Sequence, residues 1–372
     1  MTAPRFHDVA VLLSEASSPE DVFPCLRAGP RPGGLGWRSA LRGEYDRLKS
    51  AIDPSAFASD AGARAAAETL ASRLDELYQE ALGEGSSETA GYREAPPAVP
   101  SSPAKLEIRT ARGAYVATRV VTRGDLATIY AGHTVGGSSE PVIVKVAFER
   151  ADNDLLHDEA GALDLLQSAG GPQRKHLPRL LDRFQTAEGL AGNVISWVEG
   201  VDLLTVRERY PDGVPPEHAV WMLRRLLSVV GYAHSEGVIH GNIEPSHVMI
   251  RPSDHNVVLL DWCYSIIAPG RTGRGFKCEN PDYSPPEVGQ RRPPIPASDL
   301  YAVGRCAIFL LGGDLATGKL PAGIDDRLVR FVAYLTRSSP LQRAQDAWEM
   351  FEELGRLRRA IFGAHRFTPF EV

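Results

Sequence analysis

The sequence lacks the cysteine spacing of a metal site or a disulfide framework. It has four cysteines in 372 residues, at positions 25, 263, 278 and 306, and no two of them form a CxxC pair. We therefore expect neither a structural zinc site nor a disulfide scaffold, and the cysteine pattern is typical of a reducing compartment.

The chain also lacks a long apolar run and an excess of positive charge. No stretch of about 18 apolar residues occurs, so the sequence predicts no membrane-spanning helix. The short apolar patch Val9–Leu13 lies between acidic residues and is not typical of a secretory signal. The net charge of −6 gives no reason to expect a nucleic acid as partner. We expect a cytoplasmic protein that binds neither membrane nor nucleic acid.

One segment has almost no large apolar residues and is rich in proline and serine. It covers residues 83–104 and reads GEGSSETAGYREAPPAVPSSPA. Such a composition cannot bury enough apolar surface to fold, so we expect an extended linker. It separates a helical module at 1–82 from a mixed region, which we divide into a smaller lobe at 105–202 and a larger lobe with a C-terminal tail at 203–372.

Two apolar stripes at helical spacing predict a helical hairpin in the first module. They are formed by Trp37, Leu41, Tyr45 and Leu48 and by Leu70, Leu74, Leu77 and Ala81. Pro54 makes a continuous helix after Asp53 unfavourable.

The first module resembles a J-domain, the co-chaperone module that stimulates heat-shock ATPases. The resemblance is carried by SSPEDVF at Ser17–Phe23, YDRL at Tyr45–Leu48 and the closing LDELYQEAL. That family carries His-Pro-Asp in the loop between its helices, whereas this chain has Ile52, Asp53 and Pro54 there. Because the histidine is absent and the other two residues are transposed, we expect no stimulation of a heat-shock ATPase.

The region after the linker has a different pattern of apolar residues, which predicts both strands and helices. Short β-rich runs at 115–121, 128–131 and 142–147 predict antiparallel strands. Apolar residues at helical spacing predict helices at 155–166, 219–235 and 299–311. A sheet-rich lobe followed by a helical lobe is an α+β pattern.

Four motifs in this region resemble protein kinases. They are VIHGNIEPSHVMI at Val238–Ile250, VVLLDW at Val257–Trp262, YSPPEV at Tyr283–Val288 and SDLYAVG at Ser298–Gly304. In that family they form the catalytic loop, the metal-binding strand end, the end of the activation segment and the start of a buried helix, so the resemblance implies a bilobal kinase-like fold. HGN-x-x-P followed by LLDW also resembles small-molecule kinases of the aminoglycoside class, but the two downstream motifs favour the protein-kinase branch.

The resemblance implies altered catalytic positions. The catalytic carboxylate of the family aligns with Asn242, an amide that cannot act as a base. The loop lysine aligns with Glu244, and the asparagine that holds a second magnesium aligns with His247. Imidazole is a poor ligand for a hard cation that prefers oxygen.

The nucleotide pocket implied by the resemblance is partly retained. Lys145 lies where the phosphate-binding lysine belongs, Glu159 is its partner, Asp261 could hold one magnesium ion and Asp202 could meet a ribose hydroxyl. The Lys145–Glu159 pair has two interpretations, a structural ion pair or a nucleotide contact.

Other features of this pocket are altered. Of the three glycines of the phosphate loop only Gly124 remains, with Asp125 beside it. The small residue against adenine is replaced by Val144 in one register or Ile143 in the other, and both are bulky. Together with Ile129 they predict a partly filled pocket.

Residues that maintain the fold in kinases are present. His240, Trp262 and Leu163 align with the apolar spine between the lobes. Glu287 is expected to pair with Arg343, and Asp299 to bond the backbone of the catalytic loop. Gly241 replaces the arginine that would bind a phosphorylated activation loop, so activation by phosphorylation is not expected.

From these residues we predict an inactive pseudokinase that acts as a protein-binding adaptor or scaffold. No cofactor or metal is expected; if a metal binds, Asp261 holds it. The partner is expected to be another protein, such as a kinase, a phosphatase or a chaperone-related protein. Two alternatives stay open: an unconventional nucleotide-dependent phosphotransferase that uses Lys145 and Asp261 with ATP and magnesium, and a chaperone accessory protein that acts through the J-like module.

Overall fold

The computed structural model describes residues 6–16, 18–23, 44–45, 48–49, 51–57, 61–82, 106–124, 126–364 and 366–372. The chain divides into two compact units, Met1–Ser101 and Ser102–Val372. The predicted linker at 83–104 lies outside the described residues, as do Trp37, Leu41 and Asp125. None of the described helices has both the length and the apolar character needed to cross a membrane.

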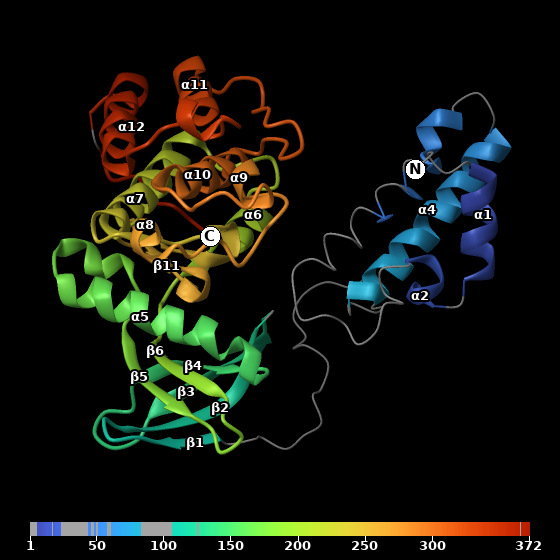
Figure 1. Cartoon of the computed structure of the whole chain (residues 1–372). Coiled ribbons are helices and arrows are strands. Elements are labelled where there is room, and N and C mark those ends of the chain that lie inside the picture. Colours follow the sequence, from blue (N-terminus) through green and yellow to red (C-terminus); the bar gives the residue numbers. More distant parts are fainter. Residues whose placement is uncertain are drawn as a thin grey trace. The chain divides into compact units, whose positions relative to one another are not determined.

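The described part of the first unit is helical (Figure 1). Its elements are α1 (Phe6–Glu15), α2 (Pro19–Val22), the 3-10 helix η2 (Pro54–Phe57) and α4 (Ala61–Leu82). Three residues of the predicted second stripe contribute to the core of this unit: Leu74 and Leu77 are fully buried in it, and Leu70 packs against it. The patch Val9–Leu13, which we had not predicted as helix, belongs to α1 and buries Val9 and Leu13 in the same core.

The smaller lobe of the second unit is built on a six-stranded antiparallel sheet in the order β1-β2-β3-β4-β6-β5. The strands are β1 (Leu106–Arg109), β2 (Ala114–Arg123), β3 (Ala127–Thr134), β4 (Pro141–Ala147), β5 (Leu180–Gln185) and β6 (Ala191–Ser196). Alternate residues of β4 face opposite sides, so Val142, Val144 and Val146 fill one apolar cluster while Lys145 faces the other way.

Helix α5 (Asn153–Ala169) runs between this sheet and the helical lobe (Figure 1). Leu156, Ala160 and Leu163 are spaced by four and three residues and are fully buried. This spacing places them on one face of the helix. Glu159 lies among them and is fully buried too. The helix therefore delivers a carboxylate to the boundary between the lobes.

The larger lobe consists mainly of helices packed around one apolar core. Its helices are α6 (Leu203–Arg209), α7 (Pro216–Ser235), α8 (Pro269–Thr272), α9 (Pro286–Gly289), α10 (Pro296–Leu310), α11 (Asp326–Leu335) and α12 (Ala347–Phe362). Short strands lie beneath them, namely β7 (Val201–Asp202), β8 (Val238–Ile239), β9 (Val248–Arg251), β10 (Asn256–Leu259) and β11 (Ile266–Ile267). Short 3-10 helices lie at 245–247, 262–264 and 340–342 in this lobe and at 150–152 and 172–176 in the smaller lobe.

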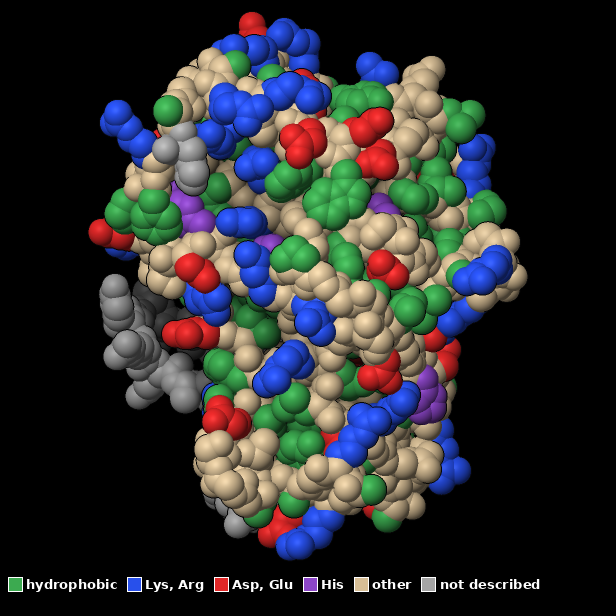
Figure 2. Space-filling model, turned by 90° about the vertical axis from the view of Figure 1, so that its left-hand side faces the viewer, with side chains coloured by type: hydrophobic (Ala, Val, Ile, Leu, Met, Phe, Trp, Pro, Cys, Tyr) green, Lys and Arg blue, Asp and Glu red, His purple; other side chains and the backbone are tan. Residues whose placement is uncertain are grey.

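Basic side chains gather on the larger lobe in the view of Figure 2. Arg224 of α7 is half-buried and bonds the Phe351 carbonyl of α12. Burial lowers the pKa of Arg224, and the like charges of Arg358 and Arg359 lower it further. The two helices thus bring several guanidinium groups close together.

The α+β architecture predicted from the sequence is confirmed. The predicted strands correspond to β2, β3 and β4, and the predicted helices correspond to α5, α7 and α10. The boundary that we drew after Asp202 falls within the larger lobe, because β7 pairs with β9 there.

Candidate active site

Three charged side chains meet between the two lobes. The Lys145 ammonium lies 2.6 Å from Glu159 Oε1 and 2.6 Å from Asp261 Oδ1. Lys145 comes from β4, Glu159 from α5 and Asp261 from the turn after β10. The second oxygen of Glu159 accepts a hydrogen bond of 2.9 Å from Asn193 on β6. Residues 116 positions apart in the chain are thereby joined in one ion-pair network.

The charges of this network stabilise one another. Burial works against the charged form of Lys145, but the negative charges around it, of which Asp261 acts most strongly, raise its pKa well above the ordinary value. Burial likewise opposes ionisation of Asp261, and the Lys145 ammonium nevertheless holds the pKa of that carboxyl well below its usual range. Lys145 is therefore positively charged and Asp261 negatively charged at neutral pH.

Asp261 adopts a backbone conformation that is uncommon for a side-chain-bearing residue. Its φ is 58° and its ψ is 66°, in the left-handed region. Non-glycine residues in this region are uncommon and cluster at functional sites. The conformation sends one carboxylate oxygen to Lys145 and the other toward His247.

His247 links the catalytic loop to Asp261. Its Nδ1 lies 2.9 Å from the Asn242 carbonyl oxygen, so Nδ1 carries the proton and donates. Its Nε2 lies 3.3 Å from Asp261 Oδ2 and 3.7 Å from Glu244 Oε1. The imidazole thus presents Nε2 to two carboxylates.

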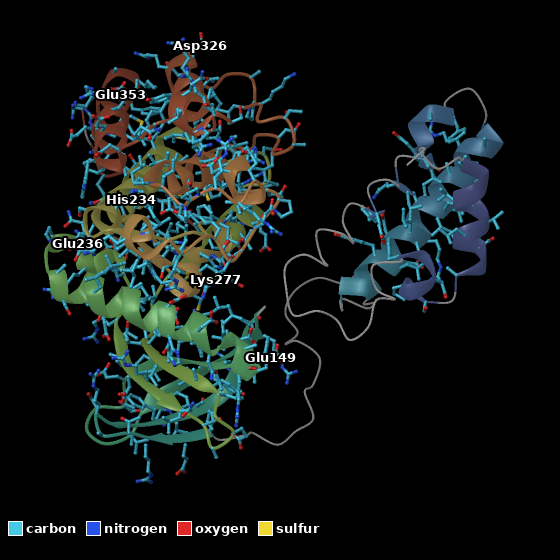
Figure 3. The ribbon with its side chains drawn as sticks, in the orientation of Figure 1. Glu149, His234, Glu236, Lys277, Asp326 and Glu353 are labelled. Carbon is cyan, nitrogen blue, oxygen red and sulfur yellow. The ribbon has the colours of Figure 1, made fainter. Side chains whose placement is uncertain are left out.

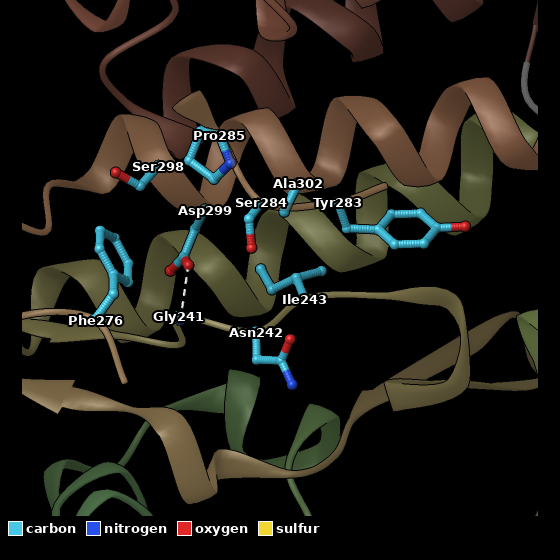
Figure 4. A pocket seen from close by; sticks show the side chains of 10 residues that line it. All are labelled: Gly241, Asn242, Ile243, Phe276, Tyr283, Ser284, Pro285, Ser298, Asp299 and Ala302. Carbon is cyan, nitrogen blue, oxygen red and sulfur yellow. Dashed lines mark hydrogen bonds between the residues drawn. The ribbon is translucent and has the colours of Figure 1, made fainter. Parts of the chain in front are cut away.

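Glu244 and Asn242 occupy the remaining altered positions. The Ser246 hydroxyl and the Asn280 side-chain amide donate hydrogen bonds to the Glu244 carboxylate. Asn280 belongs to the segment that precedes α9, so Glu244 joins the catalytic loop to that segment. Asn242 lines a cavity of about 10 Å³, which has room for roughly one water molecule (Figure 4).

Asp299 binds the backbone of the catalytic loop. Its carboxylate accepts hydrogen bonds from the backbone amides of His240 (2.8 Å) and Gly241 (2.9 Å), as Figure 4 shows for Gly241. It also bonds His234 Nε2 at 2.9 Å. Asp299 is therefore placed where the kinase resemblance put it, at the start of α10.

The spine residues pack together in the core. The His240 and Trp262 rings lie 4.6 Å apart in an edge-to-face arrangement, and Leu163 is fully buried in the same apolar cluster as Trp262. Burial lowers the pKa of His240 to about 4, so its ring is neutral at pH 7.

Glu287 and Arg343 form a bidentate buried ion pair. Arg343 Nη1 donates to Glu287 Oε1 at 2.6 Å and Nη2 donates to Oε2 at 3.0 Å. The side chains of both residues are almost completely buried. The pair ties the end of the activation segment to the stretch before α12.

On the adenine side, the structure decides between the two registers. Val144 packs in the apolar cluster on the far side of the sheet. Ile143 lies two residues before Lys145 and therefore on the same face as the ammonium. Ile129 is the cross-strand partner of Lys145, so it lies on that face too. Ile143 and Ile129 thus share the face of the sheet that carries Lys145, whereas Val144 lies on the opposite face.

Two further residues of the predicted pocket have local structural roles. The Asp202 carboxylate accepts a hydrogen bond of 2.7 Å from the Thr205 amide and caps α6. Gly124 closes the β2–β3 turn through its amide, which donates to the Ala127 carbonyl at 3.0 Å. Asp202 keeps a second oxygen that this cap does not use.

In the first unit, Ile52 is a core residue. It is fully buried among the apolar side chains of that unit, while Asp53 is exposed and Pro54 begins η2. The position that would carry the functional histidine of a J-domain is therefore turned inward.

Sequence reasoning missed two residues of the ion-pair network. Asn193 orients Glu159, and Cys263 lies with its sulfur 3.8 Å from the Lys145 ammonium. Burial raises the pKa of the Cys263 thiol well above its ordinary value, so the thiol is neutral. Only the register of β6 against β4, which pairs Asn193 with Lys145, brings Asn193 to this position.

Comparison with known proteins identifies relatives of this chain. The chain is 34% identical over 195 residues to the serine/threonine-protein kinase PknA of Nostoc sp., which covers 50% of this chain and 31% of that protein. It is 30% identical over 199 residues to pkn3 of Myxococcus xanthus (50% and 35%) and 28% identical over 211 residues to PkaB of Streptomyces coelicolor (54% and 48%), both also named serine/threonine-protein kinases. The chain thus matches between a third and a half of each relative. No protein-family model matches it.

These relatives correct one prediction. We predicted an inactive adaptor, but the relatives are named as serine/threonine-protein kinases, which favours the alternative of a phosphotransferase and argues against the absence of enzymatic activity. The comparisons do not show a J-domain in the first unit. The fold of the second unit is protein-kinase-like, and the three relatives named above are bacterial serine/threonine-protein kinases.

Proposed function

We propose that the second unit is a nucleotide-dependent phosphotransferase that uses Lys145 and Asp261. The observation that carries this proposal is the triad of Lys145, Glu159 and Asp261, in which both carboxylates lie 2.6 Å from one ammonium. Such a triad holds a lysine charged and immobile at the boundary of the two lobes. A charged lysine beside a carboxylate is the pair that phosphoryl transfer in kinases requires.

The residues present fit a nucleoside triphosphate with a divalent cation on the phosphate side. The Lys145 ammonium can bind phosphate oxygens, and Glu159 keeps it in place. Asp261 uses Oδ1 for Lys145, and its second oxygen, Oδ2, lies 3.3 Å from His247 Nε2. The bound nucleotide and cation would supply the phosphoryl group and neutralise its charge. On the adenine side Ile143 narrows the site, so we expect weaker nucleotide binding than in a kinase with a small residue there.

His247 extends the cation site. Its Nδ1 proton is committed to the Asn242 carbonyl, and Nε2 faces Asp261 Oδ2 at 3.3 Å. A proton or a metal ion can bridge a nitrogen and a carboxylate oxygen at this distance. Two ligands that each lie about 2.0–2.2 Å from one ion would be about 3.0–3.5 Å apart, which matches this distance. Asp261 and His247 are therefore the residues that would hold the cation, and the imidazole favours a transition-metal ion over magnesium.

The proton of the acceptor hydroxyl needs a base, which Asn242 cannot supply. Glu244 provides a carboxylate two residues along the same loop, and Ser246 and Asn280 orient it. We assign Glu244 as the proton acceptor. By analogy with the relatives' names, the acceptor is a hydroxyl of a protein. A kinase, a phosphatase or a chaperone-related protein as partner stays a prediction.

The test is phosphate transfer from radiolabelled ATP, with magnesium or manganese, to the chain itself and to generic protein acceptors. Incorporation that disappears in Lys145→Met and in Asp261→Asn, but persists in the surface variant Lys319→Met, supports the proposal. Absence of incorporation in the wild-type chain under both metals would contradict it.

A further inference from the structure

The segment between Asp261 and α9 is bound to α5 by two basic residues. The Arg274 guanidinium forms a bidentate pair with Asp158 of α5, with Nη1 2.8 Å from Oδ1 and Nη2 bonded to Oδ2. Lys277 is labelled in Figure 3. Its ammonium lies 3.0 Å from Asp158 Oδ2 and also bonds Asp154, one turn earlier on the helix. Two cations from one segment thus converge on one carboxylate of α5.

Asp158 is well suited to receive them. Its side chain is only 14% exposed, whereas that of Arg274 is 36% exposed and that of Lys277 is 29% exposed. Burial opposes ionisation of Asp158, but Arg274 and Lys277 hold the pKa of its carboxyl below the ordinary value. The carboxylate is therefore charged at neutral pH, and its desolvation is compensated by three hydrogen bonds.

Asp158 is the neighbour of Glu159 in the chain. On an α-helix, consecutive residues are separated by about 100° around the axis. Fixing Asp158 against the activation segment therefore fixes the rotation of α5, which directs Glu159 toward Lys145. A rotation of α5 that broke the Lys145–Glu159 pair would also break the contacts of Asp158.

The catalytic loop offers no alternative anchor for a phosphorylated activation segment. Gly241 has a φ of +78°, and a Cβ there would lie 2.7 Å from the Tyr264 carbonyl oxygen. An arginine at this position would be strained and would clash with the backbone. The link between the activation segment and α5 is instead made by side chains whose charge does not depend on modification.

We infer that Arg274 and Lys277 are positioning residues, which hold α5 through Asp158 so that the Lys145–Glu159 pair forms in the unphosphorylated chain. The role in catalysis rests on the proposed function, whereas the role in holding α5 does not. The activation segment of this chain thus acts as a built-in clamp in place of a phosphorylation switch.

The test compares the double variant Arg274→Gln/Lys277→Gln with the control Arg271→Gln, which changes an exposed arginine of the same segment. We expect faster amide hydrogen exchange in α5 of the double variant, with exchange in α10 unchanged. We also expect kcat for phosphate transfer to fall about 5- to 150-fold, the range typical of coupling between two sites, with KM for the acceptor unchanged. Arg271→Gln should match the wild type in both measurements.

A charge exchange separates positioning from a general loss of stability. Asp158→Arg combined with Arg274→Asp restores opposite charges at the same two positions, so exchange in α5 should return toward the wild-type rate, which Asp158→Arg alone should not achieve. Because these ion pairs are partly exposed, 1 M NaCl should weaken them. Amide exchange in α5 of the wild type should then become faster and approach the rate of the double variant. Wild-type exchange rates in the α5 amides of the double variant would overturn the inference. If the wild type transfers no phosphate, the proposed function fails while the exchange data still decide whether α5 is held.

Discussion

The Lys145 ammonium bonds Asp261 Oδ1 at 2.6 Å across the boundary between the two lobes, although 116 residues separate them in the chain. The same ammonium bonds Glu159, which is fully buried. The charge of one ammonium therefore compensates the negative charges of two carboxylates that have lost most of their contact with water. Both the stability of the second unit and its proposed chemistry depend on this one cation.

Lys145→Met should lower stability even without nucleotide. It removes the ammonium that Glu159 and Asp261 share in a buried site, and breaking a buried pair costs about 3–5 kcal/mol. We expect a lower melting temperature for the variant alone, and loss of the shift with ATP, which for a ligand at 100 times its Kd is worth about 2.7 kcal/mol. Thermal unfolding of wild type, Lys145→Met and the surface control Lys319→Met, each with and without ATP and metal, measures both effects. Equal melting temperatures without nucleotide would show that the pair does not stabilise the fold.

Glu244→Gln should remove the proposed proton acceptor. Loss of a general base lowers rates by about 10²–10⁴-fold, so we expect a fall of this size in kcat with little change in melting temperature. Asn242→Asp in the Glu244→Gln background restores a carboxylate to the loop and should recover part of the rate. Glu279→Gln, at an exposed position of the activation segment, is the control. A Glu244→Gln variant with wild-type kcat would exclude Glu244 as the base.

His247→Asn should change the preferred cation. An amide oxygen replaces the imidazole nitrogen, which favours magnesium over a transition metal. We expect the variant to bind manganese more weakly relative to magnesium than the wild type does. Titration of free Mn²⁺ by electron paramagnetic resonance, with competition by Mg²⁺ in the presence of a non-hydrolysable ATP analogue, measures this ratio. His157→Asn on the exposed face of α5 should leave it unchanged. An unaltered ratio in His247→Asn would mean that Nε2 does not contact the ion.

The burial of His176 should make stability fall between about pH 6.5 and pH 4. Burial lowers the pKa of His176 to about 4, although its hydrogen bond to the Val257 carbonyl works the other way. In that window the unfolded chain takes up a proton that the folded chain does not, so stability decreases as pH falls. The effect is worth about 3 kcal/mol.

Urea unfolding of His176→Gln across this window tests the assignment. The variant should show a shallower loss of stability at low pH than the wild type, by about that amount. His157→Gln, at an exposed position, should keep the wild-type slope. Parallel curves for wild type and His176→Gln would show that His176 titrates normally.

Ile52→His should destabilise the first unit without creating a J-domain activity. Ile52 is fully buried, so the substitution places a polar ring in the core and loses apolar burial, at a cost of about 2–5 kcal/mol. The transposed Asp53 and Pro54 remain, so we expect no stimulation of a heat-shock ATPase by wild type or variant. Thermal unfolding and a steady-state ATPase assay with the full chain measure the two outcomes. Stimulation by the wild type would restore the chaperone hypothesis.

The sequence by itself determined the elements of the second unit and the identity of the candidate site residues. Strands β2–β4 and helices α5, α7 and α10 were predictable because their apolar periodicity is local, and Lys145, Glu159 and Asp261 stand in motifs that are contiguous in the chain. The sequence also led to the wrong prediction of an inactive adaptor. Asn242 and Glu244 were each compared separately with the residue that the kinase family has at that position.

Tertiary structure alone decided which side chains meet. The register of β4 places Ile143 on the face that carries Lys145 and Val144 on the opposite face. Asp202 caps the N-terminus of α6 through its hydrogen bond with the Thr205 amide. Ile52 is fully buried in the core of the first unit. The contact of Arg274 and Lys277 with Asp158 joins residues more than 100 positions apart. No local pattern encodes such a contact, because it depends on how the activation segment packs against α5, which only the folding of both lobes sets.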